Sequence, residues 1–218
     1  MARLRVGVLV SGRGTNLQAL IDACAVPDFP AEIVAVLSNR ASAPALERAR
    51  RAGIPARAVP HHDFADRPAF ERALDAALAE TRADFVCNAG FMRILTPWFV
   101  ERWRDRQINI HPSLLPAFPG LDTHERALAA GVRISGCTVH FVRAETDAGP
   151  IIVQAAVPVL PDDDVGRLAA RVLAAEHRIF PLALRLVAEG RARVEGERVK
   201  LSGCRPAADT LVNPASDA

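Results

Sequence analysis

The chain has 218 residues, of which 50% are hydrophobic, a length that favours one domain able to bury roughly 70% of its unfolded surface without disulfides. Its formal net charge is only +2, with arginines spread along the sequence, which argues against nucleic acid as a partner because such binding needs a concentrated basic face. No apolar run approaches the roughly 20 residues of a membrane span, so we expect no membrane association.

In the N-terminal part, short apolar runs alternate with longer amphipathic stretches. The apolar runs predict four strands, at residues 5–10, 33–38, 56–59 and 84–87. Apolar residues at helical spacing predict three helices between them, at residues 16–24, 44–52 and 67–81. This alternation implies crossover connections, so the predicted fold class is α/β with a doubly wound, mostly parallel sheet.

The middle of the chain predicts shorter elements and a change of strand direction. A short helix at 96–103, with Thr96 as its cap, precedes a strand at 107–110. A helix at 123–130 follows, and then two alternating segments, 136–142 and 151–157, which predict antiparallel strands joined by a loop.

The C-terminal segments predict one long helix and a hairpin. Aspartates at 162–164 cap the helix, which extends to about residue 189 and is expected to kink at Pro181. An alternating segment at 191–201 with a Glu-Gly turn predicts the hairpin. We therefore expect a single domain over residues 1–201, followed by a tail rich in Pro, Ala and Asp at 202–218.

The first motif is residues 11–16 (SGRGTN), between the first strand and the first helix. Glycines permit a tight turn there, and exposed amide groups together with the helix dipole favour an anion. The motif lacks the third glycine of a dinucleotide fingerprint, because Leu17 stands at that position. A single phosphate is the predicted ligand, and a tight turn without a ligand is the alternative.

The second motif is residues 109–116 (NIHPSLLP), at the end of a predicted strand. Strand alternation places Asn109 and His111 on the same side, about two residue rises apart. A carboxamide and an imidazole could then address one carbonyl oxygen, and Pro112 and Pro116 would preorganise the pair. The alternative is a core histidine satisfied by its neighbours, with Asn109 capping a turn.

Asp147 is a third candidate, in the loop between the predicted antiparallel strands. A lone loop aspartate is usually a turn residue, and the Gly149-Pro150 pair that follows makes a turn natural. The residues alone leave the role of Asp147 open.

Several segments occur in the order and approximate spacing of one enzyme family. They are residues 11–16 (SGRGTN), 90–95 (GFMRIL), 109–116 (NIHPSLLP), 139–142 (VHFV), 147–150 (DAGP) and 176–181 (EHRIFP). Over residues 5–201 the chain resembles the glycinamide ribonucleotide formyltransferase family. Asn-x-His with a downstream Asp is shared with other 10-formyltetrahydrofolate enzymes, whereas segments 11–16 and 119–124 (PGLDTH) indicate the ribonucleotide branch.

The resemblance implies a Rossmann-like formyltransferase fold and a one-carbon transfer. The co-substrate 10-formyltetrahydrofolate would give its formyl group to the amine of N1-(5-phospho-D-ribosyl)glycinamide. The products would be N2-formyl-N1-(5-phospho-D-ribosyl)glycinamide and tetrahydrofolate, in de novo purine (IMP) biosynthesis. No metal is implied.

The resemblance also implies site residues. Asn109, His111 and Asp147 match the catalytic trio, in which Asn109 and protonated His111 would stabilise the oxyanion and Asp147 would favour the charged ring. The residues that match the acceptor site are Gly14, Thr15, Asn16 and Glu176. The residues that match the folate site are Arg67, Met92, Arg93, Ile94, Leu95, Asn109 and Val142.

The implied division of labour places acceptor and phosphate binding in about residues 1–105 and catalysis and folate binding in about 106–201. Asp122 stands where members of the family have histidine, which leaves the details of the acceptor pocket open.

The expected partners are therefore small molecules, for a chain that is a monomer or a homodimer. Cysteines without a Cys-x-x-Cys pair, three of them in apolar segments, and a start without a cleavage-site pattern predict a cytoplasmic location.

Three alternatives remain open. A methionyl-tRNA formyltransferase would be expected to carry an extra basic C-terminal domain. A formyltetrahydrofolate hydrolase would be expected to have a regulatory domain before the first strand. A non-catalytic nucleotide-binding module would have no need of the Asn109, His111 and Asp147 set.

Overall fold

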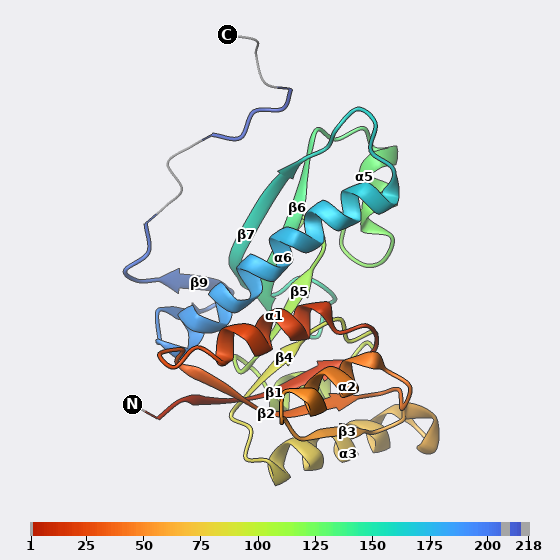
Figure 1. Ribbon diagram of the computed structural model, residues 1–218, viewed down its shortest axis with the longest axis vertical. Helices are drawn as coiled ribbons and strands as arrows, with labels where there is room; N and C mark the ends of the chain where they lie inside the picture. The colour runs from red at the N-terminus through yellow and green to blue at the C-terminus, as the bar shows by residue number, and fades with distance from the viewer. Residues whose placement is uncertain (1, 206–209, 215–218) are drawn as a thin grey trace.

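A seven-stranded sheet, in the order β3-β2-β1-β4-β5-β6-β7, forms the centre of the fold (Figure 1). The computed structural model describes residues 2–205 and 210–214. The strands are β1 (Leu4–Val10), β2 (Ala31–Ser38), β3 (Ala56–Ala58), β4 (Phe85–Asn88), β5 (Gln107–His111), β6 (Ile134–Phe141), β7 (Ile151–Pro158), β8 (Ala192–Glu195) and β9 (Arg198–Leu201). The helices are α1 (Thr15–Cys24), α2 (Pro44–Arg51), α3 (Arg67–Glu80), α4 (Pro97–Arg102), α5 (Thr123–Ala129) and α6 (Val165–Ala188), with a 3-10 helix at His61–Asp63.

The sheet is parallel from β3 to β5 and antiparallel from β5 to β7. The strands β8 and β9 form a separate antiparallel hairpin. The strand order reverses at β1, which defines a doubly wound sheet with ligand sites beyond the carboxyl ends of its strands. The predicted fold class is confirmed, and the predicted elements differ from the observed ones mainly at their ends.

Two local features differ from the sequence expectations. The 3-10 helix at His61–Asp63 is too short to show a periodic pattern. Thr96 precedes α4 as predicted, but its hydroxyl donates to the buried Glu71 carboxylate and caps no helix N–H group. Glu71 also accepts the Thr96 amide at 2.7 Å. The expected side-chain cap is wrong, and a carboxylate of α3 fixes the start of α4 instead.

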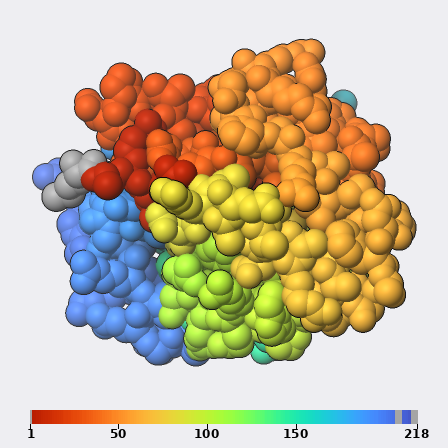
Figure 2. Space-filling view, turned by 90° about the horizontal axis from the view of Figure 1, so that it is seen from below, coloured from red at the N-terminus to blue at the C-terminus, as the bar shows by residue number. Residues whose placement is uncertain are grey.

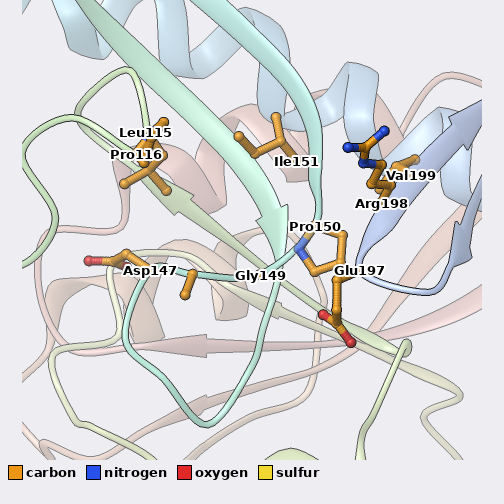
Figure 3. Close-up of a pocket in the computed structure, with 10 residues that line it drawn as sticks. Leu115, Pro116, Asp147, Gly149, Pro150, Ile151, Glu197, Arg198 and Val199 are labelled. Atoms are coloured by element: carbon orange, nitrogen blue, oxygen red, sulfur yellow. The ribbon is translucent and has the colours of Figure 1, made fainter.

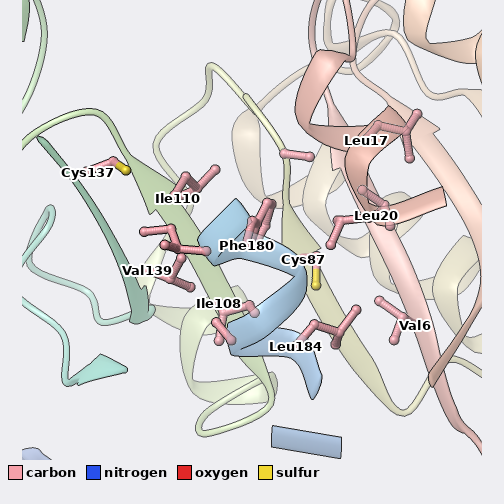
Figure 4. Packing of buried hydrophobic residues seen from close by; sticks show 14 of the residues in the cluster. Val6, Leu17, Leu20, Cys87, Ile108, Ile110, Cys137, Val139, Phe180 and Leu184 are labelled. Atoms are coloured by element: carbon pink, nitrogen blue, oxygen red, sulfur yellow. The ribbon is translucent and has the colours of Figure 1, made fainter. Parts of the chain in front are cut away.

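Alternate residues of the inner strands face two apolar clusters, one on each side of the sheet. Val6 and Val8 belong to the cluster that includes α1 and α6, whereas Leu9 belongs to the cluster that includes α3 and α4. Figure 4 shows Phe180 and Leu184 of α6 within the first cluster, beside the strands. Because both faces are covered, the inner strands are apolar along most of their length.

A glycine in β1 lets α3 pack closely on the sheet. A Cβ atom at Gly7 would lie 2.3 Å from Cδ2 of Leu78, a fully buried residue of α3. Figure 2 shows the surface of α3 (gold) adjoining the segment around residues 85–105 (yellow to yellow-green). Any side chain at position 7 would therefore displace the Leu78 side chain from its place against the sheet.

The long helix α6 joins the antiparallel strands to the start of the chain. Asp164 accepts the N–H group of Arg167 at 2.8 Å, which confirms the predicted cap. The helix continues through Pro181 to Ala188 and packs against α1, β6 and β7 (Figure 1). This packing brings its buried face to the helix that follows the first motif.

The described part of the tail after Leu201 forms no helix or strand. Asn213 donates from Nδ2 to the Val159 carbonyl at 2.9 Å, so the tail returns to the end of β7. Of the predicted tail, residues 206–209 and 215–218 lie outside the described residues. The three cysteines expected in apolar segments are free and buried. Within residues 2–205 and 210–214, no helix has the length and apolar character that crossing a membrane requires.

Candidate active site

Two polar side chains stand at the carboxyl end of β5. Asn109 and His111 are alternate residues of this strand and therefore lie on the same face, as predicted. In the antiparallel pairing with β6, Asn109 stands opposite His140 and His111 opposite Thr138. The site thus begins where β5 ends, between a parallel and an antiparallel neighbour.

Asp147 reaches this pair from the loop between β6 and β7. Its Oδ2 atom lies 3.4 Å from Nδ1 of His111, and its Oδ1 atom lies 3.8 Å from Nε2 of His140. The side chains of His111 and Asp147 are only 7% and 10% exposed, so water screens their interaction weakly. The proximity that the sequence interpretation required of His111 and Asp147 is observed.

The loop backbone aims the Asp147 carboxylate at the histidines. Asp147 has a φ of 57°, in the left-handed region, and its Oδ2 atom accepts the Gly120 N–H at 2.8 Å. The loop closes tightly behind it, since a Cβ atom at Gly149 would lie 1.7 Å from the Phe141 carbonyl oxygen. The Phe141 N–H donates to the Pro150 carbonyl at 2.9 Å and so holds the two ends of the loop together. We refer to these two ends as the neck of the loop.

The hydrogen-bonding partners of His111 favour a ring with two N–H groups. Nε2 lies 3.0 Å from the Phe118 carbonyl oxygen, which only accepts, and Nδ1 faces the Asp147 carboxylate. An imidazolium satisfies both acceptors, whereas a neutral ring satisfies one. Burial, and to a lesser extent the neighbouring His111, lower the pKa of His124 below its ordinary value, which favours the neutral form of this second histidine.

His140 belongs to the cluster, although the sequence interpretation gave it no role. Nδ1 donates to the Phe141 carbonyl at 2.9 Å, which leaves Nε2 to accept from Nδ2 of Asn109 at 3.3 Å. Burial lowers the pKa of His140, against the opposing effects of the Phe141 bond and the Asp147 charge, and so favours the neutral ring. His140 therefore orients the Asn109 carboxamide. Only the register between β5 and β6 identifies this partner.

A second polar pair lies at the start of α1. Nδ2 of Asn16 donates to Oε2 of Glu176 at 2.6 Å, and both residues are buried. Burial raises the pKa of the Glu176 carboxyl, and the Asn16 bond opposes that shift. Oδ1 of Asn16 is buried and has no hydrogen-bond partner in the described part of the chain. The structure thus brings together two residues that the resemblance assigned to one ligand.

Gly14 makes the turn into α1 possible. Its φ is 74°, and a Cβ atom there would lie 2.6 Å from the Cβ of Ala45. Thr15 begins the helix, so amide groups of the turn and the first helical turn are free to face an anion. A groove of about 430 Å³ runs along α1 from Thr15 and is also lined by Arg48 and His177.

The turn is joined to the segment at residues 90–95 through Ser11. Its buried hydroxyl donates to Oδ1 of Asn39 at 2.6 Å and accepts the Met92 N–H at 2.8 Å. The acceptor motif and the segment assigned to folate are therefore in direct contact.

The residues assigned to folate differ in exposure. Met92 and Ile94 are exposed and Leu95 is buried, while Arg93 and Val142 are intermediate. Val142 donates its N–H to the Gln107 carbonyl at 2.9 Å, at the start of β5.

Arg67 is exposed at the first turn of α3, and no hydrogen bond or ion pair in the described structure links it to the β5 cluster.

A groove of about 480 Å³ borders the Asp147 loop on its outer side. Its lining includes Asp147, Gly149 and Pro150 of the loop and Glu197 and Val199 of the β8–β9 hairpin. In Figure 3 the carboxylates of Asp147 and Glu197 lie on opposite sides of this groove. The loop therefore has one side toward the histidines and another toward the hairpin.

Comparison with known proteins agrees with this geometry. A family model described as formyl transferase matches residues 4–184. The trifunctional purine biosynthetic protein adenosine-3 of Bos taurus is 53% identical over 88% of the chain, which spans only 19% of that protein's length. Phosphoribosylglycinamide formyltransferase of Escherichia coli is 45% identical, with 93% of this chain and 95% of that protein covered. The crystal structure of glycinamide ribonucleotide transformylase 1 from Symbiobacterium toebii is 51% identical with a TM-score of 0.89, over 91% of this chain and 94% of that one.

A doubly wound sheet with this polar cluster beyond β5, together with the match over most of its length, shows that the chain belongs to the formyl transferase family. Within that family, two relatives that match it nearly from end to end, from Haemophilus influenzae and Escherichia coli, are phosphoribosylglycinamide formyltransferases.

Proposed function

We propose that the chain transfers the formyl group of 10-formyltetrahydrofolate to the amine of N1-(5-phospho-D-ribosyl)glycinamide, a step of purine biosynthesis. The observation that carries this proposal is the polar cluster beyond β5, in which Asp147 lies 3.4 Å from His111 and 3.8 Å from His140, the hydrogen-bonding partner of Asn109. The names of the full-length relatives support the choice of acceptor.

The first chemical step forms a bond between the acceptor nitrogen and the formyl carbon. The formyl oxygen then carries the negative charge of the tetrahedral intermediate. Nδ2 of Asn109 has a second N–H group besides the one that faces His140, and this group donates to the oxyanion. His111 donates from Nε2 when the substrate oxygen replaces the Phe118 carbonyl as its acceptor. Each such donor is worth roughly 10²–10³ in rate.

The proton then moves from the acceptor amine to the folate nitrogen. Asp147, through one water, takes the proton that the attacking amine loses. The bond between the formyl carbon and N10 of folate breaks as the oxyanion collapses, and the N–H of His111 protonates N10. The proton on Asp147 then returns through water to Nε2 of His111, the nitrogen that gave up its proton, so the enzyme ends as it began. Acid–base catalysis of this kind contributes about 10²–10⁴ in rate.

The acceptor is held at the start of α1. Amide groups of Gly14, Thr15 and Asn16 bind its phosphate, as helix N-termini bind anions. Oδ1 of Asn16, buried without a hydrogen-bond partner in the described residues, accepts an N–H or O–H group of the acceptor. The Glu176 carboxylate, which already accepts from Asn16, completes this polar wall.

The folate lies on the other side of the cluster. The segment at residues 92–95, with Val142, contacts its ring system, and Arg67 binds its anionic end from the first turn of α3. Residues 1–105 then contribute most of the acceptor site and residues 106–201 the catalytic groups. The enzyme acts in the cytoplasm, as a monomer or homodimer, on small molecules alone.

One assay tests the proposal. The purified chain is incubated with 10-formyltetrahydrofolate in three separate reactions. The acceptor is N1-(5-phospho-D-ribosyl)glycinamide in the first, methionyl initiator tRNA in the second and water alone in the third. We expect tetrahydrofolate to form rapidly only with the ribosylglycinamide. Formation with methionyl-tRNA, or at the same rate in water, would replace this function by one of the two rival folate activities.

A further inference from the structure

Arg143 stands directly after Val142, at the point where the Asp147 loop leaves β6. Its side chain is only 9% exposed, which is unusual for a guanidinium group. The reaction proposed above uses no group of this residue. A buried charge of this kind must be explained by its partners.

The partners of Arg143 come from two other parts of the chain. Nη2 donates to Oδ1 of Asp105 at 2.8 Å, and Nε donates to Oε2 of Glu197 at 2.8 Å. Nη1 donates to the Val142 carbonyl at 3.1 Å. Arg104 supports the arrangement, since its Nη2 donates to Oε1 of Glu197 at 3.0 Å. We refer to Arg143, Asp105 and Glu197 as the Arg143 clasp.

The clasp connects the two segments that carry the catalytic groups. Asp105 lies two residues before β5, the strand of Asn109 and His111, while Arg143 lies four residues before Asp147. Glu197, in the turn of the β8–β9 hairpin, forms ion pairs with both Arg104 and Arg143. Figure 3 shows it on the hairpin side of the groove that the Asp147 loop borders.

The loop also packs directly on Arg143. A Cβ atom at Gly149 would lie 3.3 Å from Cγ of Arg143, so the returning strand of the loop lies against the arginine stem. The guanidinium group of Arg143 therefore fixes the start of the loop, and the aliphatic part of the same side chain packs against the end of the loop at Gly149. Displacement of Arg143 would widen the neck on which the position of Asp147 depends.

We infer that the Arg143 clasp sets the distance between Asp147 and His111 by locking the neck of the 143–150 loop to the segment before β5 and to the C-terminal hairpin. Arg143 is a positioning residue that touches neither substrate. For its effect on turnover, this inference rests on the proposed function. A misplacement of about 1 Å in a catalytic group can cost roughly 10²-fold in rate.

The test compares Arg143→Met, which keeps the stem and removes the donors, with the milder Glu197→Gln. We expect kcat to fall at least about tenfold in Arg143→Met and less in Glu197→Gln, with the KM of the phosphorylated acceptor within about twofold of the wild type. Because Arg143 and Glu197 are the two partners of one ion pair, the double variant should lose little more kcat than Arg143→Met alone. Arg143→Lys, which keeps the charge, should recover part of kcat.

Arg171→Met is the matched control. Arg171 donates to both carboxylate oxygens of Asp163 at the start of α6, at 2.6 and 2.9 Å, away from the 143–150 loop. The Arg171→Met variant should lower the melting temperature as Arg143→Met does and leave kcat unchanged. Equal kcat losses in both variants would mean a general effect of stability, and would overturn the clasp.

A second measurement does not depend on activity. Hydrogen exchange of the amides at residues 143–150, without substrates, should be faster in Arg143→Met and Glu197→Gln than in the wild type and Arg171→Met. Unchanged exchange there would overturn the clasp whether or not the enzyme is active. An inactive wild type would instead contradict the proposed function and leave this measurement to decide on the clasp.

Discussion

The two histidines beside Asp147 show how neighbouring residues of one type acquire different tasks. His111 has a carbonyl oxygen at one nitrogen and a carboxylate at the other, so its ring is suited to carry a proton. His140 donates to Phe141 and accepts from Asn109, so its ring is suited to stay neutral. The same carboxylate lies near both rings, and the second partner of each ring makes the difference.

Replacement of Asp147 by Asn tests the carboxylate. The carboxamide of the variant would keep an oxygen that can accept the Gly120 N–H, so the loop should keep its shape. We expect turnover to fall at least about a hundredfold, because both the base and the charge beside His111 are lost. Acceptor binding, measured by calorimetry, should be nearly unchanged.

The control for this change is Glu145→Gln, which removes an exposed carboxylate from the same loop. It should keep the wild-type turnover. Near-wild-type turnover in Asp147→Asn would mean that Asp147 is neither the base nor the partner of a charged His111.

The buried Glu176 carboxyl predicts a pH dependence of stability. Burial raises its pKa in the folded state, so the folded state binds this proton more tightly than the unfolded state. The resulting stabilisation is present below the unfolded pKa and is lost as the pH rises through the raised folded pKa. Glu176→Gln keeps an oxygen for the Asn16 bond and cannot ionise.

We therefore expect Glu176→Gln to melt at a higher temperature than the wild type at about pH 8, and at nearly the same temperature at about pH 4. Thermal melts at several pH values measure this gap. A gap that narrows as the pH rises would show that the charged form of Glu176 is the one that the fold favours.

At the scale of elements, the close contact of α3 with β1 depends on the absence of a side chain at position 7. Gly7→Ala would place a Cβ atom 2.3 Å from Cδ2 of Leu78. Overpacking of this kind costs about 1–3 kcal/mol, which corresponds to a fall in melting temperature of roughly 2–12 °C for a chain of this size. Thermal melts measure the loss.

The double variant Gly7→Ala/Leu78→Ala tests the cause. Since the second change removes the atom that the new Cβ meets, the combined loss of stability should be smaller than the sum of the two single losses. Additive losses would place the strain of Gly7→Ala somewhere other than at α3.

The elements were more predictable from the sequence than their contacts. Hydrophobic periodicity indicates β1, α3 and α6 because a buried face leaves a regular pattern in the residues themselves. The bond from Thr96 to Glu71 leaves no such pattern, because a threonine before a proline suits an ordinary cap equally well. The partnership of Asn109 with His140 depends on the register of β5 on β6, which periodicity alone does not specify.

At the scale of the whole molecule, the site brings together residues that are far apart in the sequence, beyond the carboxyl ends of the inner parallel strands. Asn16 and Glu176 are 160 residues apart and share a 2.6 Å hydrogen bond, because α6 returns across the sheet to α1. Ser11 joins the acceptor motif to Met92 in the segment assigned to folate. The resemblance assigns residues to each ligand, and the topology explains how these residues come into contact.

The separation of the two ligands predicts opposite effects of two variants. Asn16→Ala removes both the partner of Glu176 and the oxygen assigned to the acceptor, so acceptor affinity should fall about tenfold or more, as expected for bonds to a charged or buried group. Folate affinity should stay unchanged.

Met92→Ala, which truncates an exposed side chain of the segment at residues 92–95, should weaken folate binding and leave acceptor binding unchanged. Calorimetry of each ligand alone measures both pairs of affinities. The reverse pattern in Asn16→Ala would mean that the phosphate-bearing acceptor binds away from α1, and that the polar pair of Asn16 and Glu176 serves the fold alone.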